Sequence, residues 1–457
     1  MKVAAHKSKL SGHITVPGSK SHTIRALILS AMAEGVSYIK NPLPSNDCLS
    51  TLNAIGKIGA HLIEKKNVGT EEIWVIQGAG NKLHLPEGEI DVGNSGSLMY
   101  FLCPVLSTLK GECLFTGDES ICTRPVGHLL DALHQFGAKA LSVKNNNCPP
   151  FTFEGPIDIS KTLITDGKLS QYISGFMMAA LRTEGTMLLK LTDPKETPYL
   201  TMTKMWLDSV GAQCSISPDF KTVSVTGPVE IKGFERSIPS DWEGVAFPLI
   251  AALISGSKVT VDNIDFSGSQ GDDKIVDVLT SVGAKISLDK TAGTLTVDGS
   301  NDSSDSVSSG PAHLSTASLP GGKLEVNVSS FPDAICALCV IACFIEGTTV
   351  LTDVEICRKK ETDRVKAMCS LLTSLGADIH EEGDSVVING TMGGKNLHGG
   401  TVESYKDHRI AMSLSCLALG LKDTEELIIN DAECCSVSFP LYFEKMNELG
   451  AGYKVLS

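Results

Sequence analysis

The sequence lacks any run of 18 apolar residues, and its first 16 residues contain no apolar core of signal-peptide length. The first absence argues against a membrane-spanning helix and the second against a secretory leader. We therefore expect a cytoplasmic chain. With 457 residues and a hydrophobic content of 42%, the chain is long enough to bury two substantial cores rather than one.

Positive charge is also scarce, because 39 Lys and Arg stand against 53 Asp and Glu for a formal net charge of −14. An acidic chain of this kind is a poor default partner for nucleic acid or for anionic membranes, and we expect neither as a partner. An anionic ligand would need a local positive pocket in a negative molecule. The positions of Lys and Arg are therefore informative.

Disulfide and metal patterns are missing as well, although the chain has 14 cysteines. They are scattered through apolar segments, where a free thiol serves as a small hydrophobe. Cys336 and Cys339 form a C-x-x-C, but no second pair lies at zinc spacing. We expect reduced cysteines and no metal site, and a metal or redox role of the C-x-x-C is the lesser alternative.

What the sequence does contain is a sixfold repeat. Six helical patterns close on a hydrophobic residue followed by Gly and Ala, and Gly suits the position just past a helix because the chain there turns left-handed. The closures end at Ala60, Ala138, Ala212, Ala284, Ala377 and Ala451. A period of roughly 75 residues is too long for an ordinary solenoid and predicts one supersecondary unit copied six times.

We predict an α/β (α+β) fold of six βαβαβ-type repeats, three in each of two domains. The lower domain is predicted at residues 1–17 plus 238–457 and the upper domain at 18–237. A segment rich in Ser, Asp and Gly at 298–322 is predicted to be a flexible surface insertion. Each repeat has one helix that is apolar on all sides after its first turn and is expected to be buried. These helices are predicted at 21–33, 96–107, 171–181, 242–254, 333–345 and 408–419.

Polar and charged residues stand at the starts of these helices, where free backbone N–H groups and the helix dipole favour anions. Lys20, Ser21 and Arg25 offer a charge, a hydroxyl and a fork of donors close together. Gly96 lies in a Gly-Asn-Ser-Gly-Ser segment that lets the backbone approach a ligand, and Arg124 precedes a proline. Taken alone, each is also typical of a tight turn or a solvated helix start.

The second half of the chain has denser clusters. Residues 358–364 place four cations and two acids ahead of an apolar helix, and this alternation suits proton transfer beside an anion site. Such a charge run is more often a solvated helix start. His408 and Arg409 open the last buried helix, where packing alone does not account for them. We expect the six helix starts to converge on a small polyanionic ligand.

These motifs, in this order, resemble the enolpyruvyl transferases, and specifically the 5-enolpyruvylshikimate-3-phosphate synthase family. The shared motifs span residues 18–442 and read G-S-K-S-x-x-x-R, G-N-S-G-S, R-P-x-G-H, S-Q, P-D-A, K-E-T-D-R and D-H-R-x-A-M. The last two are the most specific. The related UDP-N-acetylglucosamine enolpyruvyl transferases have G-A-K-N and a loop cysteine upstream of R-P, and Cys122 lies too close to Arg124 to be that cysteine.

The resemblance implies an inside-out α/β barrel whose two domains close on the ligands. It also implies a reaction of the shikimate pathway, in which the enolpyruvyl group of phosphoenolpyruvate passes to the 5-hydroxyl of shikimate 3-phosphate and phosphate is released. No metal or organic cofactor is implied, and we expect small-molecule substrates as partners and a monomer. A reaction through a tetrahedral phosphate ketal needs a proton donor, a base and several cations.

By motif position, the resemblance assigns candidate residues to three roles. Asp333 is the candidate base near the attacking hydroxyl, and Glu361 with Lys20 is assigned to proton transfer at the methylene. The residues expected around phosphoenolpyruvate are Lys20, Gly96, Arg124, Gln171, Arg364 and Arg409. The residues expected around shikimate 3-phosphate are Ser21, Arg25, Ser170, Gln171, Tyr199, Asp333 and Lys360.

The chain also departs from the family at positions that would touch the substrates. Tyr100, Leu169, Glu196, Ile356 and Val437 stand where the family has Arg, Ser, Ser, Asn and Lys. A carboxylate at Glu196 would repel a dianion. Three lysines stand where they would offset part of the lost positive charge: Lys168, Lys195 and Lys406.

Two other hypotheses therefore stay open. The first is an enolpyruvyl transferase that acts on a different cyclic alcohol. The second is a binding paralogue without catalysis, and the retention of both anion-binding cations and proton carriers argues against it.

Overall fold

The computed structural model describes residues 1–68, 71–301 and 313–456. Within these ranges the chain forms six four-stranded sheets. Packing divides it into two compact units, which are described separately: unit 1 comprises Met1–Pro17 and Ser240–Ser457, and unit 2 comprises Gly18–Pro239.

The second repeat of unit 2 shows the common pattern. Its elements in chain order are β6 (Ile90–Asp91), α3 (Gly96–Leu106), β7 (Gly111–Thr116), α4 (Gly127–Gln135), β8 (Lys139–Ser142) and β9 (Phe151–Gly155). In the sheet order β6-β7-β9-β8, strands β6 and β7 run parallel and the other pairs are antiparallel. The predicted α/β fold of six repeats is confirmed, with one strand more in each repeat than the predicted βαβαβ unit.

The first and third repeats of unit 2 follow the same pattern. The first contains α1 (Lys20–Met32), β3 (Val36–Lys40), α2 (Asn46–Lys57), β4 (His61–Val68) and β5 (Glu71–Gln77), and β14 (Glu235–Ser237) completes its sheet by pairing with β3. The third contains β10 (Thr162–Thr165), α5 (Ser170–Ala179), β11 (Gly185–Leu191), α6 (Thr197–Ser209), β12 (Gln213–Ile216) and β13 (Thr222–Gly227).

Unit 1 contains the other three repeats. The first has α7 (Trp242–Ser255), β15 (Lys258–Asp262), α8 (Ile275–Ser281), β16 (Lys285–Asp289) and β17 (Thr294–Asp298). The second has β18 (Lys323–Asn327), α9 (Ile335–Ala342), β19 (Gly347–Thr352), α10 (Arg364–Ser374), β20 (Asp378–Glu382) and β21 (Ser385–Gly390). The third has β22 (Gly400–Glu403), α11 (His408–Ala418), β23 (Glu426–Asn430), α12 (Tyr442–Glu448) and β24 (Lys454–Leu456).

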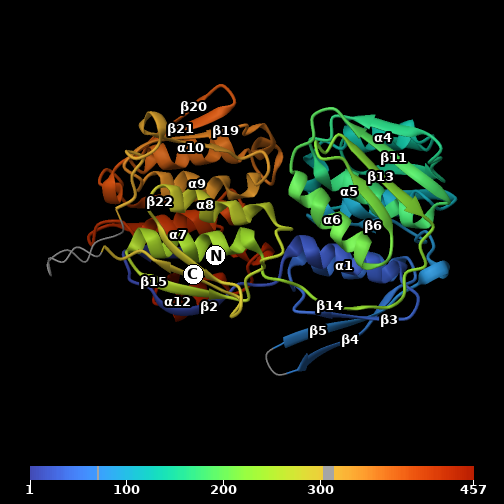
Figure 1. Cartoon of the computed structure of the whole chain (residues 1–457), viewed down its shortest axis with the longest axis horizontal. Helices are drawn as coiled ribbons and strands as arrows, with labels where there is room; N and C mark the ends of the chain where they lie inside the picture. Colours follow the sequence, from blue (N-terminus) through green and yellow to red (C-terminus); the bar gives the residue numbers. More distant parts are fainter. Residues whose placement is uncertain (69–70, 302–312, 457) are drawn as a thin grey trace. The chain divides into compact units, whose positions relative to one another are not determined.

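The two N-terminal strands complete the sheets of unit 1. Strand β1 (Lys2–His6) lies between β23 and β24, and β2 (Ser11–Thr15) runs parallel to β15. Figure 1 shows β2 beside β15, although the whole of unit 2 separates them along the chain. This pairing explains why the first 17 residues belong to the same unit as the C-terminal half.

Each unit is built around three helices that are buried on nearly all sides. They are α1, α3 and α5 in unit 2, and α7, α9 and α11 in unit 1. In unit 1 the three helices contact one another, and in unit 2 α3 contacts both α1 and α5. The sheets alternate buried and exposed side chains, as β8 and β15 do, so one face of each sheet is exposed. The six helices predicted from uniform apolarity are therefore confirmed.

The six closing glycines of the repeat have φ angles between 86° and 106°. Only glycine adopts this backbone region freely, so the Gly at this position marks the end of the second helix in each of the six repeats. Of the predicted insertion at 298–322, residues 302–312 lie outside the described residues. Beyond them, Ser315 forms an isolated bridge with Glu346.

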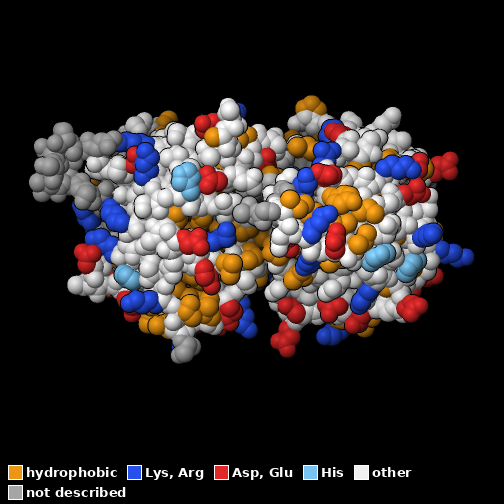
Figure 2. Space-filling view, turned by 90° about the horizontal axis from the view of Figure 1, so that it is seen from below, with side chains coloured by type: hydrophobic (Ala, Val, Ile, Leu, Met, Phe, Trp, Pro, Cys, Tyr) orange, Lys and Arg blue, Asp and Glu red, His pale blue; other side chains and the backbone are white. Residues whose placement is uncertain are grey.

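None of the fourteen cysteines forms a disulfide in the structure. Cys336 and Cys339 are fully buried in α9, and burial raises the pKa of both thiols. In the described part of the chain, no helix has the length and apolarity needed to cross a membrane. On the face drawn in Figure 2, Lys and Arg side chains lie among Asp and Glu rather than in one basic area.

Candidate active site

Helix α1 begins at Lys20, one of the predicted catalytic residues. Its Nζ lies 3.4 Å from Oδ2 of Asp47, in the first turn of α2, and both side chains are largely buried. Because the ammonium is held by a carboxylate from a second helix, it is fixed at the start of α1 instead of extending into solvent. Asp47 was not among the predicted site residues.

Arg25 lies one turn further along α1 and is 1% exposed. Its guanidinium donates to hydroxyls, through Nε to Thr203 Oγ1 at 2.9 Å and through Nη2 to Ser174 Oγ at 3.3 Å. It also donates to the carbonyl oxygens of Ser21 (3.0 Å) and Tyr199 (3.3 Å). Burial lowers the pKa of Arg25 to about 9, so the guanidinium stays charged at neutral pH.

Arg25 has no carboxylate in an ion pair among the residues that the structure describes. Its guanidinium carbon lies 4.5 Å from the ring centroid of Phe101 on α3, and this ring supports the charge only weakly. The positive charge of a buried cation that is held by neutral dipoles is not cancelled by a carboxylate, so it can attract an anion at full strength. The structure thus brings the predicted residues Ser21, Arg25 and Tyr199 together.

A second group of predicted residues meets at the start of α3. A Cβ on Gly96 would lie 3.7 Å from Nη1 of Arg124, so the guanidinium lies against this helix start. Arg124 donates through Nη2 to Asn94 Oδ1 at 2.5 Å and to Ser120 Oγ at 3.2 Å. The amide of Gln171 donates to Ser97 Oγ at 3.3 Å and links α5 to α3.

Ser170, the first residue of α5, is bound by a carboxylate of the chain itself. Oε2 of Glu196 accepts hydrogen bonds from the Ser170 backbone N–H at 3.1 Å and from its hydroxyl at 2.9 Å. Glu196 is 2% exposed, and its backbone is left-handed with φ 50°. The donors that a helix start offers to an anion are therefore taken by an internal anion at this position.

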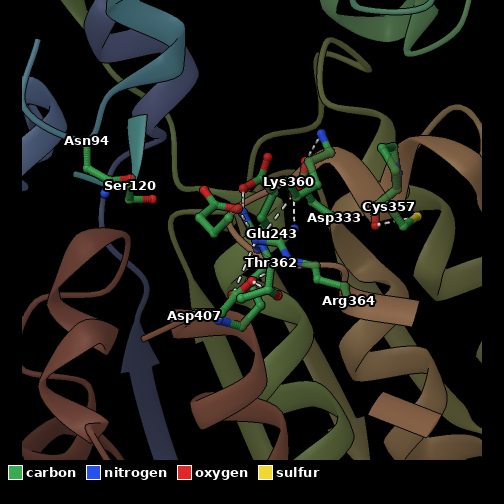
Figure 3. A network of polar contacts seen from close by, with 12 residues as sticks. Asn94, Ser120, Glu243, Asp333, Cys357, Lys360, Thr362, Arg364 and Asp407 are labelled. Carbon is green, nitrogen blue, oxygen red and sulfur yellow. Dashed lines mark hydrogen bonds and ion pairs between the residues drawn. The ribbon is translucent and has the colours of Figure 1, made fainter. Parts of the chain in front are cut away.

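In unit 1 the predicted residues form one network around Arg364, the first residue of α10 (Figure 3). Arg364 is fully buried and donates through Nε to Asp407 Oδ2 at 2.8 Å, and through Nη2 to the other oxygen at 3.3 Å. It also donates to Asp333 Oδ1 and to Glu361 Oε2, each at 2.5 Å. Burial would lower the pKa of Arg364, but the three carboxylates outweigh it and raise the pKa.

Asp333 links Arg364 to two further cations of this network, Lys360 and Arg409. It lies in the 3-10 turn η6 (Pro332–Ala334) ahead of α9, and its Oδ2 accepts from Lys360 Nζ at 3.2 Å. Burial would raise the pKa of Asp333, but the charges of Lys360 and Arg364 outweigh it and lower the pKa below its ordinary value. The carboxylate is therefore ionised at neutral pH, which is the state that a general base requires.

Arg409, the second residue of α11, also joins this network. The N-cap Asp407 accepts from the Arg409 backbone N–H at 2.9 Å, and Nε of Arg409 lies 3.3 Å from Asp333 Oδ1. Nη2 of Arg409 forms an ion pair with Glu243 in the first turn of α7. Figure 3 shows Glu243, Asp333 and Arg364 directed toward one another from three different helix starts.

The family departures noted in the sequence alter the site in two ways. Tyr100 is buried in α3, and its hydroxyl donates a hydrogen bond to the backbone carbonyl of Pro125 at 3.2 Å. Ile356 is buried, and Leu169 packs against the core of unit 2. Apolar side chains thus stand at three of the departed positions, Leu169, Ile356 and Val437, and Glu196 brings a carboxylate at a fourth.

The structure brings the predicted residues into two sets, one in each unit. Lys20, Ser21, Arg25, Gly96, Arg124, Ser170, Gln171 and Tyr199 lie at the starts of α1, α3, α5 and α6 in unit 2, and Asp333, Lys360, Glu361, Arg364 and Arg409 form the network of unit 1. Sequence reasoning missed Glu243 as a site residue. Its position in the first turn of an apolar helix, two residues after the N-cap Asp241, was the available signal.

The fold and the two sets of residues define an α/β protein of six repeats whose buried helices begin beside cationic and polar side chains. The family model of EPSP synthase (3-phosphoshikimate 1-carboxyvinyltransferase) matches residues 4–446. A 3-phosphoshikimate 1-carboxyvinyltransferase of Ruminiclostridium cellulolyticum is 35% identical over 100% of both chains, and one of Acetivibrio thermocellus is 35% identical over 99% of both. A solved EPSP synthase of Acinetobacter baumannii superposes with a TM-score of 0.79 at 26% identity and covers 100% of both chains. The chain belongs to the EPSP synthase family.

Proposed function

We propose that this chain transfers the enolpyruvyl group of phosphoenolpyruvate to the 5-hydroxyl of shikimate 3-phosphate. A new bond forms between the 5-oxygen and C2 of the enolpyruvyl group, while the hydroxyl gives its proton to a base and the methylene carbon takes up a proton. The C2–O bond to phosphate then breaks, the methyl group loses a proton again, and the released phosphate accounts for the net proton. The observation that carries the proposal is the network of Asp333, Lys360, Glu361 and Arg364, because it holds an ionised base, a proton carrier and cations within hydrogen-bond distance.

Each predicted residue receives a role in this proposal. Asp333 accepts the hydroxyl proton, and Lys360 beside it holds the acceptor and stabilises the charge. Glu361 and Lys20 deliver and remove the proton at the methylene carbon. Arg25 binds the acceptor phosphate, since it is a buried cation with no carboxylate in an ion pair among the described residues.

The remaining residues complete the binding of both substrates. Ser21, Ser170 and Tyr199 hold the acceptor. The phosphate and carboxylate of phosphoenolpyruvate are bound by Gly96, Arg124, Gln171, Arg364 and Arg409. We propose that the chain works as a monomer without a metal or organic cofactor.

A second candidate function is transfer to a different cyclic alcohol. One observation favours it: Glu196 takes both hydrogen bonds that Ser170 offers at the start of α5. A carboxylate at this position disfavours a dianionic acceptor and favours one that brings a hydroxyl or an ammonium group.

One experiment separates these functions. The purified chain is incubated with phosphoenolpyruvate and shikimate 3-phosphate, phosphate release is followed in time, and the organic product is identified by mass spectrometry. Release together with the enolpyruvyl ether of shikimate 3-phosphate supports the proposal. Release only with unphosphorylated cyclic alcohols supports the second candidate, and binding without release with any acceptor supports a paralogue without catalysis.

A further inference from the structure

Glu243 is a buried carboxylate that the proposed mechanism does not use. It lies in the first turn of α7 and is 8% exposed, and its Oε2 forms an ion pair with Nη2 of Arg409 on α11. Helices α7 and α11 pack against each other, so the pair joins two buried helices of unit 1. Figure 3 shows Glu243 directed into the network around Arg364.

Within unit 1, the ion pairs that link Glu243 to Arg364 join more carboxylates than cations among the described residues. The cations are Lys360, Arg364 and Arg409, and the carboxylates are Glu243, Asp333, Glu361 and Asp407. Four negative groups against three positive ones make an unfavourable environment for an incoming anion, and the low local dielectric strengthens every one of these interactions. A ligand anion gains a guanidinium here only if an internal carboxylate gives it up.

We propose that Glu243 is an internal competitor for Arg409, whose guanidinium an anionic substrate must share or take over. The inference rests on the proposed function, in which Arg409 binds phosphoenolpyruvate. Glu243 acts through Arg409 and is therefore a positioning residue: it holds the guanidinium in place in the absence of ligand and lowers the affinity for anions. Its effect belongs to substrate binding and not to the chemical step.

A purely structural role of Glu243 predicts a different result. Removing one partner of a buried ion pair leaves the other uncompensated, so either role predicts a less stable protein in the absence of ligand. The roles differ in the sign of the change in anion affinity. Removing a competitor withdraws one carboxylate from Arg409 and strengthens ligand binding, whereas loss of a structural support disorders Arg409 and weakens binding.

The test uses the full chain with Glu243→Gln and Glu243→Ser. The amide of Gln keeps the size and one acceptor oxygen but removes the charge, so this variant is expected to fold even if the Ser variant does not. Glu346→Gln is the matched control, because it removes the same charge from an exposed ion pair with His313 in the same unit. Dissociation constants for phosphoenolpyruvate and, separately, for inorganic phosphate are measured by calorimetry, together with the melting temperature without ligand.

We expect Glu243→Gln to melt at a lower temperature and to bind phosphoenolpyruvate roughly tenfold more tightly, with KM lowered in proportion and kcat nearly unchanged. The control is expected to change neither affinity. Equal or weaker binding of both anions by a folded Glu243→Gln variant would overturn the inference. If the chain forms no product but this variant binds inorganic phosphate more tightly, the proposed function fails and the role of Glu243 stands.

Discussion

Two buried arginines, one in each unit, are held in opposite ways. Arg25 in unit 2 donates to hydroxyl and carbonyl oxygens, and burial lowers its pKa to about 9. Arg364 in unit 1 donates to three carboxylates, which raise its pKa despite burial. The same type of side chain is therefore held by uncharged oxygens in one unit and by three carboxylates in the other.

This difference suggests different tasks for the two arginines: attracting an anion for Arg25 and positioning carboxylates for Arg364. A guanidinium has five N–H donors, and Arg364 uses four of them in its bonds to Asp407 (two), Asp333 and Glu361. Besides its proposed part in binding phosphoenolpyruvate, Arg364 therefore fixes the positions of those carboxylates, including the proposed base. Arg25 is held by dipoles that carry no net charge, so an anion near it is attracted by a full unit of uncompensated positive charge.

The largest expected effect comes from removing the group that Arg364 holds. Asp333→Ala is expected to lower kcat by roughly 100- to 10,000-fold, because a positioned base is lost. The free energy of unfolding is expected to fall only modestly, because Asp407 and Glu361 still bind Arg364. Steady-state phosphate release and thermal unfolding are compared with those of Glu346→Gln. A variant that is inactive only because it is unfolded would assign Asp333 a structural role.

Arg364→Met tests the same comparison of the two arginines through the free energy of unfolding. It leaves three carboxylates around a thioether, and loss of one partner from a buried ionic network costs about 3–5 kcal/mol. The free energy of unfolding is measured by urea titration, with hydrogen exchange in α10 as a local probe. A loss below about 1 kcal/mol would mean that the network contributes little to the fold.

The sequence predicted the residues of these networks better than their pairing. Uniform apolarity identified the six buried helices, and the motifs identified Asp333, Arg364 and Arg409. Nothing in a linear pattern indicates that Glu243 meets Arg409 or that Glu196 meets Ser170, because these pairs depend on which helix starts the fold brings together. Periodicity encodes burial, whereas a buried ion pair depends on tertiary geometry.

Arg25→Met is expected to weaken substrate binding with little loss of stability, whereas Arg364→Met is expected mainly to lower stability. The Thr203 hydroxyl still lies 2.8 Å from both Ser174 Oγ and the carbonyl oxygen of Tyr199, so few polar groups lose their partners and stability is expected to change little. The KM for shikimate 3-phosphate is expected to rise roughly 10- to 150-fold, the value of one charge-assisted hydrogen bond. If stability falls as far as in Arg364→Met, the contrast between the two arginines is wrong.

The smallest expected effect is a dependence of stability on pH that only one of the two networks shows. Lys360 and Arg364 outweigh burial and lower the pKa of Asp333 below its ordinary value of 3.8. The unfolded chain therefore takes up the proton at higher pH than the folded chain does. The stabilisation is complete above about pH 5 and is lost as the pH falls through 3.8 toward the folded pKa.

Asp333→Asn lacks this titration, so the difference in unfolding free energy between it and the natural protein is expected to narrow from about pH 6 to about pH 3.5. The partners of Arg25 are hydroxyl and carbonyl oxygens that do not titrate in this range, and the difference for Arg25→Met is expected to stay constant. Urea titrations of both variants at matched ionic strength measure the two differences. A constant difference for Asp333→Asn would show that the cations of unit 1 do not stabilise the ionised carboxylate, and the two arginines would then differ in their neighbours but not in their energetics.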